Sequence, residues 1–351
     1  MRHVPAAAFG NEGMGMSLPV IDLSSHEDAA TSPGSEVERK EIAGRSPTRI
    51  AFDRLRKDPV AVICVVVILF FIVVAVFAPL LEKLFGVSTD TVLASTRVDL
   101  VTGLPKIGPP NHGFDPDHPF GVAPGDGTDN LAVWIEGCRT SLYLATVATV
   151  GSTAIGIVLG LLAGFLGGIV DTIISFFIDL FLTFPFLLAA LSVAPILNER
   201  YATEPDKLAV VSFYVLVAIL VFFGWMTVAR LVRGEALALR EREFVKAARV
   251  IGVPTWQVLF KEILPNLLAP IIVSISLGLP TFVALEAGLS YLGIGVTGRE
   301  SWGVTINAAT KYWETYPQYL LEPVLGIAIL VVALNLLGDA VRDAFDPKTR
   351  R

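Results

Sequence analysis

Two acidic residues lie inside long apolar runs of this 351-residue chain, in which 53% of the residues are hydrophobic. Asp179 stands in TIISFFIDLFLTFPFLLAALSVAPIL and Glu286 in LAPIIVSISLGLPTFVALEAGLSYLGIG. Carboxylates at membrane depth are costly and are functional candidates by default. They either line a polar path or pair with arginine or backbone groups where helices pack. We expect a structural or gating role rather than direct substrate binding.

Residues suited to catalysis or nucleotide binding do not form a recognisable set. The dipeptide Gly-Lys does not occur, which excludes the phosphate-binding loop G-x-x-x-x-G-K-[ST]. The four histidines (His3, His26, His112 and His118) stand in tail or loop segments without metal-ligand spacing. Basic residues cluster at the ends of apolar runs rather than on one face, which argues against a nucleic-acid partner. We therefore expect a non-catalytic chain that binds no metal or cofactor itself.

A charged insert, EREFVKAARVIGVPTWQVLFKEILPNLLAP at 241–270, separates two apolar runs. Its pattern predicts two short amphipathic helices. The apolar face of the first, over about 241–251, comprises Phe244, Ala247, Ala248 and Ile251. Gly252 suits the left-handed position that ends a helix, and Pro254 suits the start of the next. The second helix presents Trp256, Leu259, Phe260 and Ile263, and we expect it to end before Pro265.

Six apolar runs are long enough to cross the hydrocarbon core, which takes about 20 helical residues. They are 60–81, 141–164, 172–197, 208–229, 268–295 and 323–341. With only 17% charged residues, the composition is typical of an integral membrane protein. The sequence therefore predicts an all-α membrane protein with six transmembrane helices and an inserted helix–turn–helix.

Proline and glycine modify three of these runs. Pro185 and Pro280 interrupt the third and fifth, where each removes a backbone hydrogen bond and allows either a flexing point or a static kink. In the second run Gly156, Gly160 and Gly164 recur at every fourth position. We expect this stripe to let another helix of the same subunit approach closely.

The distribution of Lys and Arg predicts the orientation in the bilayer. Basic residues crowd the front of the first run, the 230–267 insert and the C-terminal end, whereas the loop at 84–138 is acidic. By the positive-inside rule, the insert and both termini are cytoplasmic and the loop is outside. The predicted segments are a disordered tail (1–48), a first transmembrane helix with a basic flank (49–83), an external loop (84–138), a core of five helices (139–343) that includes a coupling loop (233–267), and a C-terminal tail (344–351).

The spacing in the insert resembles a known motif. Ala247-Ala248, Gly252 and Leu264-Pro265 are spaced as in the "EAA" loop of bacterial ABC-importer permeases, which docks on a separate ATPase subunit. Lys246 stands where that family usually has Glu, although Glu243 lies one turn earlier. By pattern alone, the insert could equally be an amphipathic helix on lipid headgroups. The resemblance favours docking, with the seven residues Glu243, Lys246, Ala247, Ala248, Gly252, Leu264 and Pro265 in the coupling loop.

The resemblance covers about residues 49–347 and is closest to the C-type permeases of dipeptide, oligopeptide and nickel importers. It is carried by RIAFDRLRKDPVAVICVVVILFFIVVAVFAPLL, FIDLFLTFPFLLAAL, LEAGLSYLGIG and NLLGDAVRDAFDP, among other segments. It implies a bacterial inner-membrane protein in contact with the lipid bilayer, a second homologous permease subunit, two ATPase subunits that bind ATP and Mg²⁺, and an extracytoplasmic substrate-binding protein. Peptides are the expected substrates, with nickel or a nickel chelate as the alternative.

Two other classes of protein also have several spans. A secondary transporter often shows internal repeats, and none is visible between 60–200 and 208–341. A membrane scaffold would not require the Ala-Ala, Gly, Leu-Pro spacing. Outside the membrane, we expect the binding protein to meet the external loop and residues 296–322, which contain Trp302, Tyr312, Trp313 and Tyr316, unless these aromatic residues form an interfacial belt.

Overall fold

The computed structural model describes residues 47–89, 94–109 and 112–345, which belong to a compact unit spanning residues 45–351. These residues form helices, with no β-structure in the described ranges beyond two isolated bridges. The predicted all-α class is confirmed. The tails predicted at 1–48 and 344–351 lie almost entirely outside the described residues.

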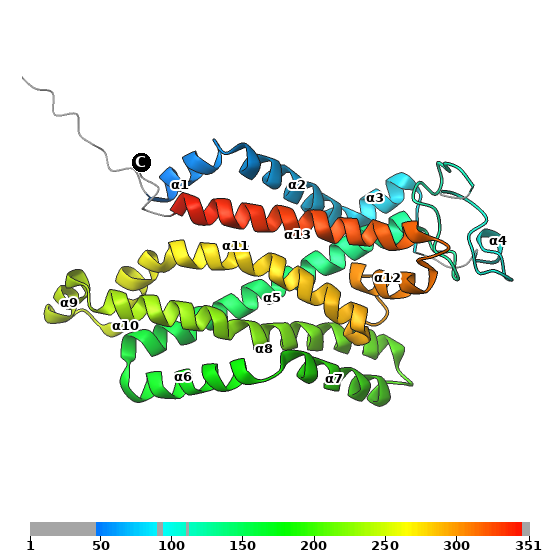
Figure 1. Cartoon of the computed structure of the whole chain (residues 1–351). Coiled ribbons are helices and arrows are strands. Elements are labelled where there is room, and N and C mark those ends of the chain that lie inside the picture. The colour runs from blue at the N-terminus through cyan, green and yellow to red at the C-terminus, as the bar shows by residue number, and fades with distance from the viewer. Residues whose placement is uncertain (1–46, 90–93, 110–111, 346–351) are drawn as a thin grey trace, which may run out of the picture. The chain divides into compact units, whose positions relative to one another are not determined.

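Five helical segments of the described chain are long and apolar enough to cross a membrane, and a bent pair supplies a sixth span if counted as one (Figure 1). The five contain α2 (Pro59–Val76), α5 (Asn130–Leu166), α8 (Pro205–Arg240), α11 (Leu264–Leu289) and α13 (Pro317–Phe345). The bent pair is α6 (Gly168–Thr183) and α7 (Phe186–Arg200). Shorter elements are α1 (Pro47–Leu55), α3 (Ala78–Phe85), α4 (Ala94–Arg97), α9 (Glu243–Val250), α10 (Thr255–Gln257), α12 (Trp302–Ala309), the π-helices η1 (Val258–Ile263) and η2 (Ser290–Ile294), and the 3₁₀ turn η3 (Thr310–Tyr312).

The third predicted span is broken rather than merely kinked. α6 and α7 meet at an angle of 75°, and Phe184 and Pro185 between them have extended backbone angles. Proline lacks the N–H that would continue the ladder and disfavours the helical conformation in the residue before it, which explains a break at this point. Pro280, in contrast, lies buried inside α11, and the helix continues through it.

Two other boundaries differ from the predicted ones. The run at 60–81 is not one helix, because α2 ends at Val76 and α3 begins at Ala78, with a proline in its first turn. α5 begins at Asn130, inside the predicted external loop. Its start is fixed by Asp129, whose side-chain oxygen accepts a hydrogen bond from the Ala132 N–H at 3.0 Å.

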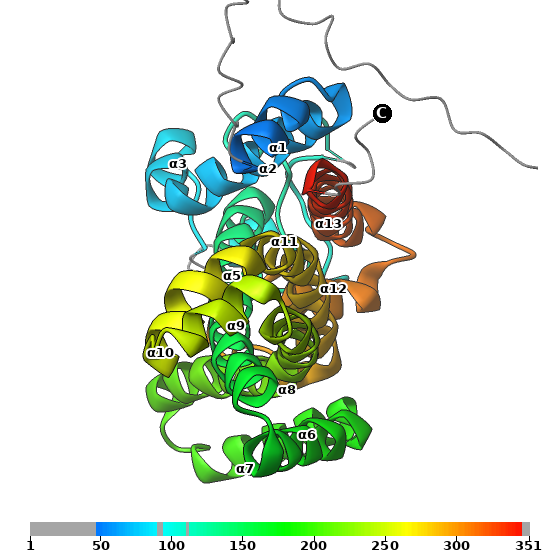
Figure 2. The ribbon, with the colours of Figure 1, turned by 90° about the vertical axis from the view of Figure 1, so that its left-hand side faces the viewer.

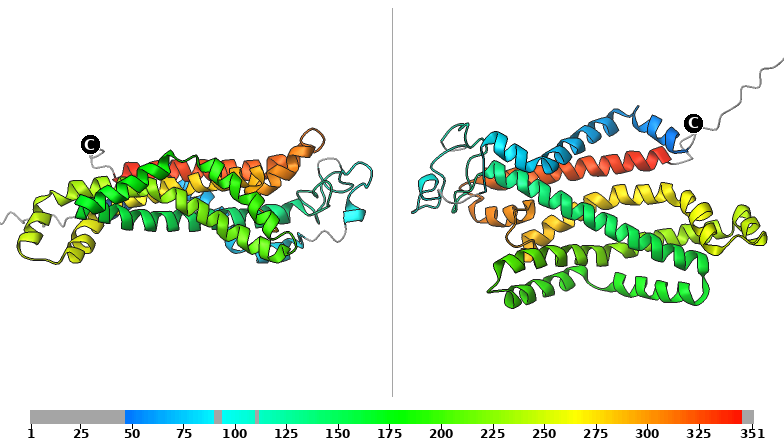
Figure 3. Two further views of the ribbon diagram at one scale, coloured as in Figure 1. Left: turned by 90° about the horizontal axis from the view of Figure 1, so that it is seen from below. Right: turned by 180° about the vertical axis from the view of Figure 1, so that it is seen from behind.

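α5 crosses the bundle diagonally and packs along α8, against α2 and α11 as well (Figure 3). The glycine stripe makes the α5–α8 contact: an added Cβ would lie 2.6 Å from the Val228 Cβ at Gly156 and 2.5 Å from the Arg233 oxygen at Gly164. The predicted packing role of this stripe within one subunit is confirmed. Seen along the bundle, α6 and α7 lie on one side and α1 to α3 on the other (Figure 2).

Candidate functional site

The insert forms two helical segments joined by a tight turn at one end of the bundle, opposite α4 (Figure 1). α9 ends at Val250, and Gly252 has the predicted positive φ, +83°. The Val253 N–H bonds to the Ala248 oxygen and the Gly252 N–H to the Arg249 oxygen, both at 3.0 Å. This pair of bonds is the Schellman arrangement, which satisfies carbonyls left open at a helix end.

The second segment does not end before Pro265, contrary to our prediction. α10, η1, α11 and η2 form one helical stretch over Thr255–Ile294. Immediately before Pro265 the helix widens, and the Leu264 N–H bonds to the Leu259 oxygen, five residues back. One missing proline N–H does not end the helix, because Val258, Ile263 and Leu267 next to it are almost completely buried.

The predicted apolar faces are each divided between two surroundings. Of the predicted face residues, Ala248, Leu259 and Ile263 are buried in a cluster with side chains of α5 and α8, together with Val245 and Val258, which we did not predict. Phe244, Val250, Ile251, Trp256 and Phe260 are exposed, by 41%, 86%, 78%, 59% and 59%. One side of the two helical segments of the insert thus packs against α5 and α8, and the other side is left exposed. We call the five exposed side chains the apolar patch.

The remaining predicted loop positions differ in exposure. Glu243, Lys246, Ala247 and Pro265 are exposed, and Leu264 is half-buried. Lys246 donates to the Glu241 carboxylate at 3.1 Å, which holds the pKa of Glu241 below its ordinary value. An exposed apolar patch bordered by charged residues is typical of a protein-docking surface.

Asp179 is paired with a cation, one of the two roles considered for it. Its carboxylate lies 2.7 Å from Arg230, and Asp171 accepts two hydrogen bonds from Arg233, at 2.5 and 2.9 Å. Both acids belong to α6 and both arginines to α8. We did not predict these particular pairs. The sequence did contain a signal for them, since Arg230 and Arg233 follow directly after one apolar run and the two acids lie at or near the start of another. The Asp179 and Arg230 side chains are 70% and 58% exposed.

Glu286 is sealed inside the protein. Its side chain is 0% exposed, and the Ser290 hydroxyl donates to one carboxyl oxygen at 2.8 Å. Its other oxygen has no hydrogen-bond partner among the described residues. Ser141 and Ser301, on α5 and at the start of α12, are also completely buried. In this conformation Glu286 therefore faces protein rather than an open path.

The aromatic residues near α12 do not form one exposed surface. Trp302 and Tyr316 are buried, and each donates a hydrogen bond, to the Trp134 oxygen at 3.0 Å and the Pro109 oxygen at 2.7 Å. Of the other two aromatic residues named in this segment, Tyr312 is half-buried and Trp313 is 59% exposed. Contrary to our expectation, Trp302 and Tyr316 are not accessible to a binding protein in this structure, because both side chains are buried.

Comparisons with known proteins agree with this architecture. Residues 46–85 match the N-terminal TM domain of oligopeptide transport permease C. The chain is 33% identical to the dipeptide transport system permease protein DppC of Alkalihalophilus pseudofirmus, over 91% of this chain and 95% of that protein. It is 30% identical to the oligopeptide transport system permease protein OppC of Bacillus subtilis, over 94% and 99%.

A solved structure of the MetNI methionine ABC transporter, in an inward-facing conformation, is also similar. It has a TM-score of 0.46 and 20% identity, covering 61% of this chain and 96% of that one. Residues 156–351, more than half of the chain, match the family model described as the binding-protein-dependent transport system inner membrane component. The chain belongs to this family of inner membrane components of binding-protein-dependent transport systems.

Proposed function

We propose that this chain is a permease subunit of an ATP-driven ABC importer for dipeptides or oligopeptides. The relatives at 33% and 30% identity are named as dipeptide and oligopeptide permeases, and they align over nearly their full lengths. The subunit forms the translocation path with a second, homologous permease. Two ATPase subunits bind ATP and Mg²⁺, an extracytoplasmic binding protein delivers the peptide, and this chain itself is neither catalytic nor cofactor-bound.

The observation that carries this proposal is the apolar patch on α9 and the start of the second segment. Five large apolar side chains, including Trp256 and Phe260, are exposed at the end of the bundle where basic residues are frequent. The helices beneath them are anchored to α5 and α8 by a buried cluster. A rigidly held apolar patch can transmit movement from a docked ATPase into the membrane helices.

The proposed orientation places both termini and the patch in the cytoplasm of the bacterial inner membrane. It follows from the excess of Lys and Arg at the ends of the spans next to the insert and from the acidic loop on the opposite side. In this orientation the patch faces the ATPase and the external loop faces the binding protein.

Uptake in a strain that lacks this chain tests the function. Cells without it should not accumulate radiolabelled tri-alanine from the medium, and a plasmid copy should restore ATP-dependent uptake. The complex purified through a tag on this chain should contain a second permease and an ATPase. Uptake that persists without this chain, in a strain with no other peptide permease, would contradict the proposal.

A further inference from the structure

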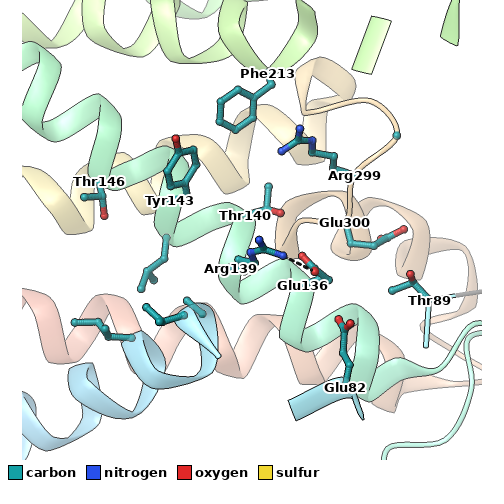
Figure 4. A pocket seen from close by; sticks show the side chains of 15 residues that line it. Glu82, Thr89, Glu136, Arg139, Thr140, Tyr143, Thr146, Phe213, Arg299 and Glu300 are labelled. Atoms are coloured by element: carbon teal, nitrogen blue, oxygen red, sulfur yellow. Dashed lines mark hydrogen bonds and ion pairs between the residues drawn. The ribbon is translucent and has the colours of Figure 1, made fainter. Parts of the chain in front are cut away.

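A large cavity lies at the end of the bundle away from α9, between α2, α3, α5, α8 and the residues before α12 (Figure 4). Its volume is about 1060 Å³. Small-molecule sites usually measure about 300–1,000 Å³, so the space suits a ligand of several residues. Unlike the cavity between α5, α6, α8 and α11, which has a mostly apolar lining, this one contains five charged side chains.

The charges in the cavity are separated into two regions (Figure 4). Glu82 and Glu300 lie toward one end, beyond Glu136. Arg299 lies toward the other, with its guanidinium 5.1 Å from the centre of the Phe213 ring. Arg299 and Glu300 are neighbours in sequence, but their side chains point apart. The cavity thus has an acidic end and a basic, aromatic end.

The acidic end has one counter-charge nearby, Arg139, whose charge acts on Glu82 but whose guanidinium is already paired with Glu136. Among the residues that line the cavity in the described chain, the ion pair is that of Arg139 with Glu136, at 3.0 Å. One carboxyl oxygen of Glu82 is buried and has no hydrogen-bond partner in the described chain. Burial, together with the charges of Asp126 and Glu136, raises the pKa of Glu300. Carboxylates in this situation are stabilised by an incoming cation.

The basic end has complementary properties. A guanidinium held over an aromatic face keeps its forked donors available for a carboxylate. Tyr143 stacks on Phe213, with ring centres 5.7 Å apart, which fixes the ring beneath Arg299. A ligand with an ammonium group at one end and a carboxylate at the other would satisfy both ends of the cavity together.

We propose that this cavity receives a peptide with two free termini, its α-ammonium at Glu82 and Glu300 and its α-carboxylate at Arg299. This inference rests on the proposed peptide-import function and assigns to this subunit a site that distinguishes free from blocked termini. The Glu136–Arg139 pair, already neutralised, lines the space between the two ends.

The test uses the complete importer, with its second permease, ATPase and binding protein, in sealed vesicles. Initial ATP-dependent uptake is measured for tri-alanine and for N-acetyl-tri-alanine, each at a concentration that saturates the isolated binding protein by calorimetry. The double variant Glu82→Gln/Glu300→Gln should lower the rate for tri-alanine relative to the rate for N-acetyl-tri-alanine about tenfold. This is the effect expected from losing one charge-assisted hydrogen bond to the ammonium group. Glu199→Gln, at an exposed carboxylate on α7 outside the cavity and outside the expected binding-protein surface, is the matched control and should leave the ratio unchanged.

A second arm examines the other end. Arg299→Gln should reduce the preference for tri-alanine over tri-alanine amide and leave the preference over the N-acetyl peptide intact. If neither the glutamate double variant nor Arg299→Gln changes its substrate preference relative to wild type, the proposed peptide site is wrong. A phospholipid that copurifies with the wild-type complex but not with the variants, at unchanged ratios, would assign the cavity to a lipid headgroup and also overturn it. A wild-type complex that transports neither peptide would instead contradict the proposed function.

Discussion

At the scale of single residues, the turn at Gly252 depends on one backbone angle. Its φ of +83° is disfavoured for residues with a Cβ, and no atom lies within 4 Å of the position that a Cβ would occupy. A substitution there therefore tests conformation alone, without a steric clash. The sequence predicted this angle from the Gly-x-Pro spacing, since helix ends have local signals.

We expect Gly252→Val to insert normally into the membrane but to reduce ATPase association and peptide uptake. The left-handed conformation costs a β-branched residue about 1–2 kcal/mol, which favours a redirected turn. Copurified ATPase and uptake are measured at equal expression. Gly288→Val, on α11 outside the coupling loop, is the control, because its added Cβ also meets open space but its φ is not positive. Wild-type coupling in Gly252→Val would refute the role of this turn.

Lys246 occupies the position that is usually Glu in the EAA loop, and we expect Lys246→Glu to be tolerated. Its ion pair with Glu241 is exposed on both sides, so solvent compensates for its loss. Uptake by this variant should stay within about twofold of wild type, the change expected from a surface pair. A severe loss of uptake would show that Lys246 contacts the ATPase directly.

At the scale of elements, the contact of α5 with α8 depends on the absence of side chains at Gly156, Gly160 and Gly164. At Gly160 an added Cβ would lie 2.6 Å from the Ala229 oxygen, which is backbone and cannot rotate away. The four-residue period predicted this contact from sequence. The division of the α9 face was not predictable in this way, because periodicity identifies apolar positions but not which neighbour covers each of them.

Gly160→Leu should destabilise the subunit by roughly 1–3 kcal/mol, the usual cost of overpacking. We expect less protein in the membrane and a lower midpoint of thermal aggregation in detergent. Gly288→Leu is the control, since a Cβ there has no neighbour within 4 Å. Equal stability of the two variants would contradict the claim that the α5–α8 contact requires glycine at position 160.

At the scale of the whole molecule, the number of apolar runs and the membrane class followed from hydropathy. The break between α6 and α7 and the pairs of Asp171 and Asp179 with arginines on α8 depend on tertiary contacts. The charged cavity at the end of the bundle away from α9 was not predicted either. Glu82, Glu136 and Glu300 are far apart in sequence, and only the packing of α3, α5 and the segment before α12 brings them to one space.

Orientation is a property of the whole chain and can be measured directly. Single cysteines replacing Arg242 or Lys261, in a background without Cys64 and Cys138, should resist an impermeant maleimide added to intact cells. They should react once the cells are permeabilised. Rapid labelling in intact cells would reverse the proposed orientation and place the apolar patch outside.

The central claim is that the apolar patch docks an ATPase, and copurification of the ATPase with this chain tests it most directly. Trp256, in α10, and Trp313, directly after α12 and η3, are each 59% exposed. Because α10 and α12 lie toward opposite ends of the bundle (Figure 1), Trp256→Glu and Trp313→Glu are a matched pair. A buried interface tryptophan contributes about 2 kcal/mol or more, a change of about 30-fold in affinity. The account predicts that Trp256→Glu loses the ATPase while Trp313→Glu retains it. Equal amounts of ATPase with both variants would contradict it.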